Sequence, residues 1–133
     1  MKNIFFLTSL IYCLLFSNCS NSESIDKKAL KVVSQFNDKC PMMIDAETRM
    51  DGIEIKDGNT IKYKYTLINL LSKNVDTSAF NSNLRKEIVN TIKTNSELDE
   101  LKRINSNFEY YYKDRENNFI YSFMITPNDY KLE

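Results

Sequence analysis

Apolar residues recur along the chain with two different periods, and each period predicts one type of secondary structure. Over residues 24–36 they follow the spacing of an amphipathic helix, at Ile25, Ala29, Val32, Val33 and Phe36. Over residues 61–71 they alternate with polar residues, which places on one face of a strand Ile61, Tyr63, Tyr65 and Leu67. The pattern therefore predicts a helix and, further along, a half-buried β-strand.

Glycines mark two irregular points of the first predicted hairpin. Asp57-Gly58-Asn59 separates the strand over 61–71 from a shorter apolar run around Ile53, and this is a strong hairpin turn signal. Gly52 interrupts the earlier strand, which predicts a β-bulge that turns Met50 and Ile53 toward compatible faces. We expect an antiparallel pair of strands here.

The second half of the chain predicts two further helices and a second hairpin. A stripe of apolar residues four apart predicts a helix over 77–94, and a pattern close to a capping box predicts a short helix over 96–103. The last two strands alternate on either side of a loop at 114–118. Their predicted inward residues are Phe108, Tyr110, Tyr112, Phe119, Tyr121, Phe123 and Ile125.

These elements follow the order α-β-β-α-α-β-β. Two hairpins need their apolar faces covered, and amphipathic helices can cover them. The sequence therefore predicts an α+β fold in which a four-stranded antiparallel sheet packs on two to three helices. Residues 25–133 contain no segment typical of a linker and are expected to form a single domain.

The N-terminal residues have a different character. Lys2 precedes an apolar run over 4–16 that is short for a membrane span, and this arrangement is typical of a cleaved export signal. Leu15-Phe16-Ser17-Asn18-Cys19, followed by a polar run, resembles bacterial lipoprotein signals in the looser form found in Bacteroidetes. The resemblance implies a signal peptide over 1–18, lipidation at Cys19 and a tether over 19–24.

Lipidation would hold the mature protein at a membrane, because several acyl chains bind a bilayer far more firmly than one does. We therefore expect an exported lipoprotein that is anchored in the bacterial cell envelope through Cys19 and faces the periplasm or the cell surface. The alternative is an ordinary secretory signal, with Cys19 an incidental thiol near the cleavage site.

Composition excludes several classes of function. The chain has no histidine, which rules out Ser-His-Asp and Cys-His catalysis and histidine metal sites, and its two glycines cannot form a phosphate-binding loop. Without residues 1–18 it carries 17 basic and 18 acidic residues, a balance that argues against a nucleic-acid partner. We expect a protein that is not an enzyme and that holds neither a cofactor nor a metal.

Two groups of residues are candidates for a binding site. The first is a charged cluster in front of the first hairpin, formed by Asp45, Glu47, Thr48, Arg49 and Asp51. Its carboxylates could bind a partner, a ligand or Ca²⁺, or serve as a general acid or base, but the cluster lacks EF-hand spacing and also fits a self-satisfied turn. The second group is an aromatic surface of Tyr63, Tyr65, Tyr110, Tyr111 and Tyr112, although such a stripe is more often explained by core packing.

The same region carries a family resemblance. Pro41-Met42-x-x-Asp45-x-x-Thr48, the Tyr63-x-Tyr65 strand and the tyrosine-rich terminal hairpin resemble a family of small exported bacterial proteins of unknown function. The resemblance covers roughly residues 33–130. It implies export and leaves the activity open.

These features predict a non-enzymatic, lipid-anchored envelope protein that binds a macromolecular partner or has a structural role. The alternative is a periplasmic inhibitor or immunity-type lipoprotein that neutralises an enzyme or a toxin. Residues 45–51 would then form the loop that contacts the enzyme or the toxin.

Cys19→Ala tests the lipid anchor. Without the acceptor thiol the chain cannot be acylated, so we expect it to lose globomycin-sensitive processing and to leave the membrane fraction. Immunoblots of fractionated cells measure the change, with Cys40→Ala as the matched cysteine control. Unchanged membrane fractionation of Cys19→Ala would contradict lipidation.

Overall fold

The computed structural model describes residues 27–56, 59–80 and 83–131. The predicted signal peptide, the tether with Cys19, and Asp57 and Gly58 of the predicted turn lie outside the described residues. The described elements are, in order, α1 (Lys27–Asn37), β1 (Met42–Met43), β2 (Thr48–Lys56), β3 (Thr60–Leu67), η1 (Ser72–Asn74), η2 (Thr77–Phe80), α2 (Asn83–Thr94), η3 (Ser96–Leu98), α3 (Asp99–Arg103), β4 (Asn107–Asp114), β5 (Phe119–Ile125) and α4 (Pro127–Tyr130).

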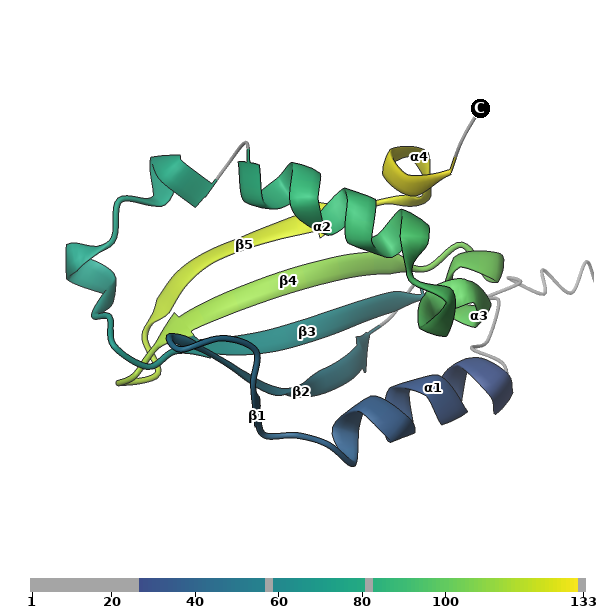
Figure 1. Ribbon diagram of the computed structural model, residues 1–133, viewed down its shortest axis with the longest axis horizontal. Helices are drawn as coiled ribbons and strands as arrows, with labels where there is room; N and C mark the ends of the chain where they lie inside the picture. The colour runs from purple at the N-terminus through teal and green to yellow at the C-terminus, as the bar shows by residue number, and fades with distance from the viewer. Residues whose placement is uncertain (1–26, 57–58, 81–82, 132–133) are drawn as a thin grey trace, which may run out of the picture.

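The strands form one five-stranded mixed sheet in the order β1-β2-β3-β4-β5 (Figure 1). Neighbouring strands are antiparallel except β3 and β4, which run parallel. The prediction of a four-stranded antiparallel sheet is therefore wrong. Each hairpin is antiparallel, but the chain between the hairpins passes through α2 and α3 and returns to the end where β3 begins. Such a crossover makes the two strands parallel neighbours.

Two short elements lack a clear pattern in the sequence. β1 has only two residues and adds the fifth strand beside β2. α4 is a single turn that begins at Pro127, with a capping box formed by Thr126 and Asp129. The described residues thus contain four α-helices where two to three are predicted. The helix predicted over 77–94 is instead η2 followed by α2, which begins at Asn83.

The helices and the sheet form two layers. α1 lies beside β2, while α2 packs over the β4 and β5 side, so that the two helices flank opposite margins of one face (Figure 1). The inward side chains of β3 and β4 fill the space beneath them. The parallel register places these side chains opposite one another in the pairs Ile61–Phe108, Tyr63–Tyr110 and Tyr65–Tyr112.

Gly52 lies at the bulge that lets α1 dock on β2. The register of β2 shifts between Met50 and Gly52, and both Met50 and Ile53 are buried, which confirms the predicted bulge. Asn37 at the end of α1 accepts a hydrogen bond from Ile53 N (2.7 Å) and donates one to Ile53 O (2.9 Å). A Cβ on Gly52 would lie 3.2 Å from Asn37 Oδ1, and the φ of +154° also disfavours a side chain there.

A second register shift, between Tyr112 and Lys113, places one extra residue, Ile120, in β5 and turns Phe119 to the opposite face from Tyr121. Phe119 is 54% exposed and packs against Tyr111 on the open face of the sheet, with ring centroids 5.4 Å apart, whereas Ile120 is buried. The prediction that Phe119 shares the inward face is wrong. The bulge adds one residue to the strand, and one residue is enough to reverse the face of a side chain.

Asp114 is a buried carboxylate at the end of β4, with 1% of the residue exposed. It accepts hydrogen bonds from the backbone N–H groups of Ser72 (2.9 Å), Glu116 (2.8 Å) and Asn118 (2.8 Å), and so joins the loop after β3 to the β4–β5 turn. Burial alone raises the pKa of this carboxyl group, but the hydrogen bonds outweigh it and hold the pKa well below its ordinary value.

Asp114→Asn tests this contribution. A carboxyl group whose pKa is lowered on folding stabilises the fold above its ordinary pKa of about 4, and that stability is lost as the pH falls toward the folded-state pKa. We expect the variant to melt at a lower temperature than wild type at about pH 7, and to lose less further stability than wild type on acidification to about pH 2. Thermal unfolding followed by circular dichroism measures both.

The matched control is Asp99→Asn, which changes an exposed aspartate. It should melt close to wild type at neutral pH. Equal melting temperatures of Asp114→Asn and wild type at neutral pH would contradict the role of Asp114.

Candidate functional site

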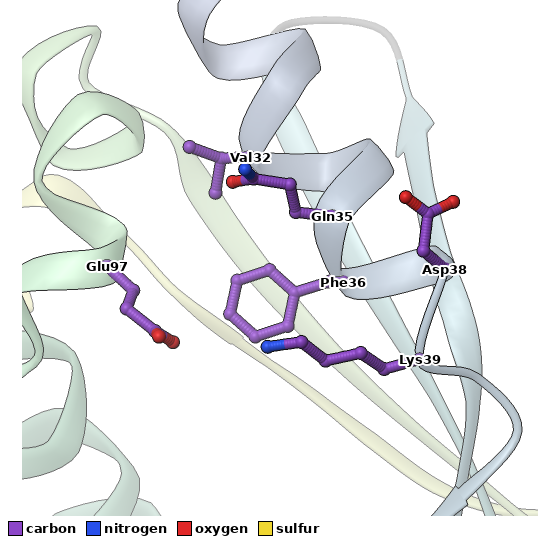
Figure 2. Close-up of a pocket in the computed structure, with 6 residues that line it drawn as sticks. All are labelled: Val32, Gln35, Phe36, Asp38, Lys39 and Glu97. Atoms are coloured by element: carbon purple, nitrogen blue, oxygen red, sulfur yellow. The ribbon is translucent and has the colours of Figure 1, made fainter.

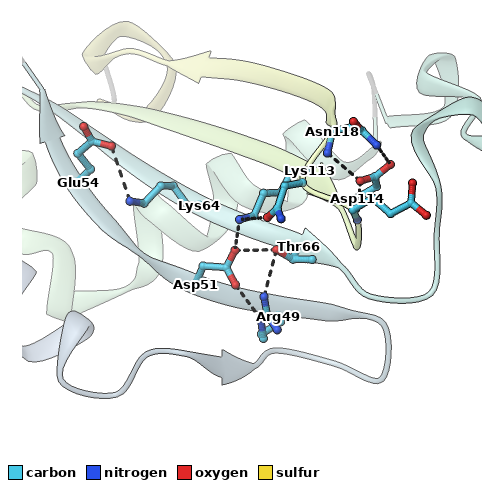
Figure 3. Close-up of polar contacts among 10 residues, drawn as sticks. Arg49, Asp51, Glu54, Lys64, Thr66, Lys113, Asp114 and Asn118 are labelled. Atoms are coloured by element: carbon cyan, nitrogen blue, oxygen red, sulfur yellow. Dashed lines mark hydrogen bonds and ion pairs between the residues drawn. The ribbon is translucent and has the colours of Figure 1, made fainter.

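The charged cluster predicted near the first hairpin is divided between two faces of the protein. Arg49 and Asp51 lie on the open face of β2, where Arg49 Nε donates to Asp51 Oδ1 (2.7 Å) and Thr66 Oγ1 donates to Asp51 Oδ2 (2.6 Å). Lys113 Nζ lies 3.2 Å from the same Oδ2 (Figure 3). Burial alone raises the pKa of Asp51, but the hydrogen bonds from these three side chains lower it below its ordinary value. The carboxylate of Asp51 thus joins β2, β3 and β4.

Asp45, Glu47 and Thr48 lie in the loop after β1 and at the start of β2. Asp45 Oδ1 accepts the backbone N–H groups of Glu47 (2.7 Å) and Thr48 (2.8 Å), which shapes the turn. These hydrogen bonds lower the pKa of Asp45, and the one from Glu47 has the largest effect. The exposed carboxylate is therefore charged at neutral pH. In the described part of the chain, no group of three or more His, Cys, Asp or Glu side chains is placed to hold a metal ion.

The five predicted aromatic residues are also divided. Tyr63, Tyr65, Tyr110 and Tyr112 point toward the helices, with ring centroids 5.1 Å apart in the stacked pairs Tyr63–Tyr110 and Tyr65–Tyr112. Tyr111 points to the open face, where its ring packs against β5 and beneath a lysine ammonium group. Four of the five tyrosines therefore form one continuous aromatic layer under the helices.

A pocket of about 340 Å³ brings members of both candidate groups together. Its floor is the sheet, with Tyr65, Leu67, Tyr110 and Tyr112. One wall is α2, with Leu84, Ile88 and Thr91. The other wall is the chain that leads into β2, with Ile44, Asp45 and Thr48. The tyrosine layer and the Asp45 turn thus meet at one site, while Glu47, Arg49 and Asp51 are not part of its lining.

The pocket offers apolar surface and a few hydrogen-bonding groups. Ile44 is 51% exposed, and Leu84 and Ile88 are only partly buried. Burial, followed by the nearby Asp45 carboxylate, raises the pKa of Tyr112 to about 12. A tyrosine with such a pKa is protonated at neutral pH, so it acts as a hydrogen-bond donor and acceptor and not as a base.

A second hollow, of about 460 Å³, lies between the end of α1 and η3. Phe36 points its ring into this space, Lys39 extends below the ring with Nζ 5.9 Å from the centroid, and Glu97 faces them from η3 (Figure 2). The remaining lining residues are Val32, Gln35 and Asp38. This end of the protein therefore combines an aromatic ring with charged groups.

Sequence reasoning did not identify Ile44 or the residues of α2 as parts of a site. The stripe through Leu84, Ile88 and Ile92 predicts a buried helix face, and Ile92 is indeed fully buried. Leu84 and Ile88 belong to the same stripe but are only partly covered. Periodicity shows which residues share a face, but it does not show how far another element covers that face.

Comparison with known proteins identifies a family and a shared fold. The family model described as Domain of unknown function (DUF8479) matches residues 24–121. No curated protein sequence matches the chain. None of the helices in the described ranges is long and apolar enough to cross a membrane.

Solved structures with a similar fold come from three bacteria. A Pseudomonas aeruginosa protein inferred to be secreted has a TM-score of 0.68 and 11% identity, over 83% of this chain and 96% of that one. The pilotin EpsS of the Vibrio vulnificus type II secretion system has a TM-score of 0.51 and 11% identity, over 85% of this chain and 100% of that one. The type II secretion pilotin AspS of Vibrio cholerae has a TM-score of 0.51 and 10% identity, over 80% and 95%. At these identities the likeness shows the fold alone.

Asp51→Ala tests whether the open-face cluster stabilises the fold. The substitution removes the carboxylate that accepts from the Thr66 hydroxyl group and pairs with Arg49 and Lys113, so we expect the free energy of unfolding to fall by about 1–3 kcal/mol. Urea unfolding followed by circular dichroism measures the loss. Glu54→Ala is the control on the same strand, because its exposed pair with Lys64 (3.8 Å) should contribute no more than about 1 kcal/mol. Equal losses in the two variants would contradict a special role for Asp51.

Proposed function

The chain belongs to the DUF8479 family, and we propose that it is an exported, non-enzymatic protein of the bacterial cell envelope that binds a macromolecular partner. The partner would bind on the helix-covered side of the sheet. The protein itself would be held at a membrane through lipidated Cys19. Each part of this proposal is supported by a different feature of the molecule.

The observation that carries the proposal is the apolar pocket between α2 and the sheet. Its volume of about 340 Å³ lies within the range of ligand-binding pockets. Tyrosine rings next to aliphatic side chains are typical of protein interfaces, because they bury a large apolar area and keep a polar group at the edge. Ile44 at the rim is half exposed, and a partner in the pocket would cover it.

The open face of the sheet favours a structural role for its polar side chains. Asp51 accepts hydrogen bonds from Arg49 and Thr66 and pairs with Lys113, and the carboxylate oxygens of Glu109 lie 3.5 Å from Lys56 Nζ and 3.7 Å from Lys62 Nζ. Charged groups that pair with one another leave less free charge for a partner. Phe119 is also exposed on this face, but the pocket lies on the helix-covered side, which we therefore propose as the binding surface.

The side-chain chemistry supports binding without catalysis. The sequence has no histidine to act as a base. Burial, with a smaller contribution from Asp51, raises the pKa of the Cys40 thiol, so that it is protonated at neutral pH and a poor nucleophile. Asp45 is an exposed carboxylate whose pKa is lowered, which favours a charged contact group over a general acid.

The envelope placement rests on two lines of support. The N-terminal residues, which lie outside the described part of the chain, carry the pattern of an export signal ending at Cys19. The solved proteins that share the fold include one inferred to be secreted and two pilotins of type II secretion systems. Both point to a protein that works outside the cytoplasm.

Site-specific photo-crosslinking in intact cells tests the binding surface. A photoreactive residue at Thr91, which is exposed and lines the pocket, should give a discrete crosslinked adduct with a partner. The matched control is the same residue at Lys93, two positions along α2 and also exposed, but outside the pocket lining. Adducts are compared on immunoblots. No adduct from Thr91, or the same adduct from both positions, would contradict partner binding at this pocket.

A further inference from the structure

Two tyrosine hydroxyl groups in the pocket between α2 and the sheet lack a partner within the described part of the chain. Tyr65 and Tyr110 line this pocket, and Tyr110 is only 7% exposed. Across the described ranges, neither hydroxyl group takes part in a hydrogen bond, and burial raises the pKa of both side chains without an opposing hydrogen bond. Both groups are therefore protonated at neutral pH and can accept a hydrogen bond as well as donate one.

Tyr63 provides a contrast within the same aromatic layer. Its hydroxyl oxygen is fully enclosed and unpaired, and the residue does not line the pocket. The hydroxyl oxygens of Tyr65 and Tyr110 are unpaired but not enclosed, so they are open to the pocket that their rings line. A group that enters the pocket can reach them and supply the hydrogen bonds that the protein leaves unmade.

Asp45 carries the charge of the pocket, since it is the one charged residue among the described residues of the lining. Its Oδ1 atom accepts two backbone N–H groups, and no lysine or arginine of the described ranges lies within ion-pair distance of the carboxylate. After burial, this carboxylate is the cause of the raised pKa of Tyr112, whose ring stacks on Tyr65 with centroids 5.1 Å apart. An unpaired negative charge thus lies beside the tyrosine layer.

Apolar side chains make up much of the remaining lining. Leu67, Leu84 and Ile88 line the pocket, and Ile44 is half exposed next to Asp45. The volume of about 340 Å³ lies near the lower end of the range for ligand pockets, which suits one long side chain better than a whole helix or strand. The group that fits therefore combines an aliphatic stem with a positively charged end.

A lysine side chain meets these requirements. Its stem can lie against the apolar walls, while its ammonium group offers three N–H donors to carboxylate and hydroxyl oxygens. A carboxylate would be repelled by Asp45, and an uncharged aliphatic side chain would leave the oxygens unpaired. Arginine is best matched by a carboxylate with both oxygens open to its planar fork, whereas Asp45 Oδ1 already accepts two backbone N–H groups.

We propose that the pocket binds one lysine side chain of the partner protein, with its ammonium group held by Asp45 and by the hydroxyl groups of Tyr65 and Tyr110. The inference rests on the proposed function and adds the chemistry of the side chain that is bound. Asp45 selects for positive charge, the two hydroxyl groups accept hydrogen bonds, and the aliphatic walls contact the stem.

Three blocked amino acids probe this proposal, namely the Nα-acetyl amides of lysine, norleucine and glutamate. The lysine and norleucine side chains share a four-carbon stem and differ in the terminal ammonium group. The full chain is reconstituted in neutral phosphatidylcholine nanodiscs, and the signal from empty discs is subtracted. Saturation-transfer difference NMR gives the dissociation constant of each compound at low and at high salt.

At low salt we expect the lysine compound to bind at least about threefold more tightly than the norleucine compound, and the glutamate compound to bind most weakly. The ratio should shrink at high salt, because ions screen exposed charges. Asp45→Asn keeps an oxygen for the backbone N–H groups of the turn but removes the charge, so it should abolish the preference for lysine. Glu47→Gln, which changes an exposed carboxylate outside the pocket lining, is the charge control and should preserve the preference.

Tyr110→Phe tests the hydroxyl contact. The substitution keeps the ring and breaks no hydrogen bond of the described chain, so we expect the fold to be unaffected. Binding of the lysine compound should weaken by about two- to fivefold, while binding of the norleucine compound stays the same. Tyr63→Phe is the matched control, because it removes a hydroxyl group that is enclosed away from the pocket, and it should leave both compounds unaffected.

The outcomes separate this inference from the proposed function. Binding of the lysine compound no tighter than that of the norleucine compound, or a preference that persists in Asp45→Asn, overturns lysine as the bound side chain. Equal effects of Tyr110→Phe and Tyr63→Phe overturn the hydroxyl contact. Binding of none of the three compounds overturns the pocket as a site for a single side chain. In each case the crosslink at Thr91 decides independently whether a partner binds at the pocket.

Discussion

Tyr63 and Tyr65 of β3 stack on Tyr110 and Tyr112 of β4 because the two strands run parallel and in register. The same pairing requires a crossover, and the crossover contains α2. Strand pairing, aromatic stacking and helix placement are therefore consequences of one another. If the strands were antiparallel, α2 would no longer be needed as a crossover, and the pocket would lose both its floor and its wall.

The polar side chains of the open face are hydrogen-bonded to one another, whereas apolar side chains on the helix-covered face remain partly uncovered. On the open face, Asp51 is surrounded by its hydrogen-bond donors, and near the end of β4 the buried Asp114 is satisfied by three backbone N–H groups. On the helix-covered face, Leu84, Ile88 and Ile44 keep apolar surface that nothing in the described chain covers completely. Uncovered apolar surface beside satisfied polar groups is the arrangement expected of a binding protein.

Local patterns predicted much of the fold. The hairpin of β4 and β5, the bulge at Gly52 and the end of α1 near Asn37 all depend on residues close in sequence, so turn signals and periodicity identify them. The parallel pairing of β3 with β4 depends on residues about 47 positions apart, such as Tyr63 and Tyr110, and no local pattern encodes it. The sequence pattern did not predict the bulge in β5 for another reason: both Phe119 and Ile120 are apolar, so the pattern does not show which of them turns inward.

The sequence by itself determined the types of most elements, the alternation that turns Tyr63, Tyr65, Tyr110 and Tyr112 to one side, and the absence of histidine chemistry. Only the tertiary structure decided that Arg49 and Asp51 lie on the opposite face from the pocket that Asp45 lines, although all three are within seven residues. Only the tertiary structure, likewise, placed Leu84 and Ile88 above the tyrosines. Periodicity records the direction in which a side chain points, whereas a site depends on which distant element lies in that direction.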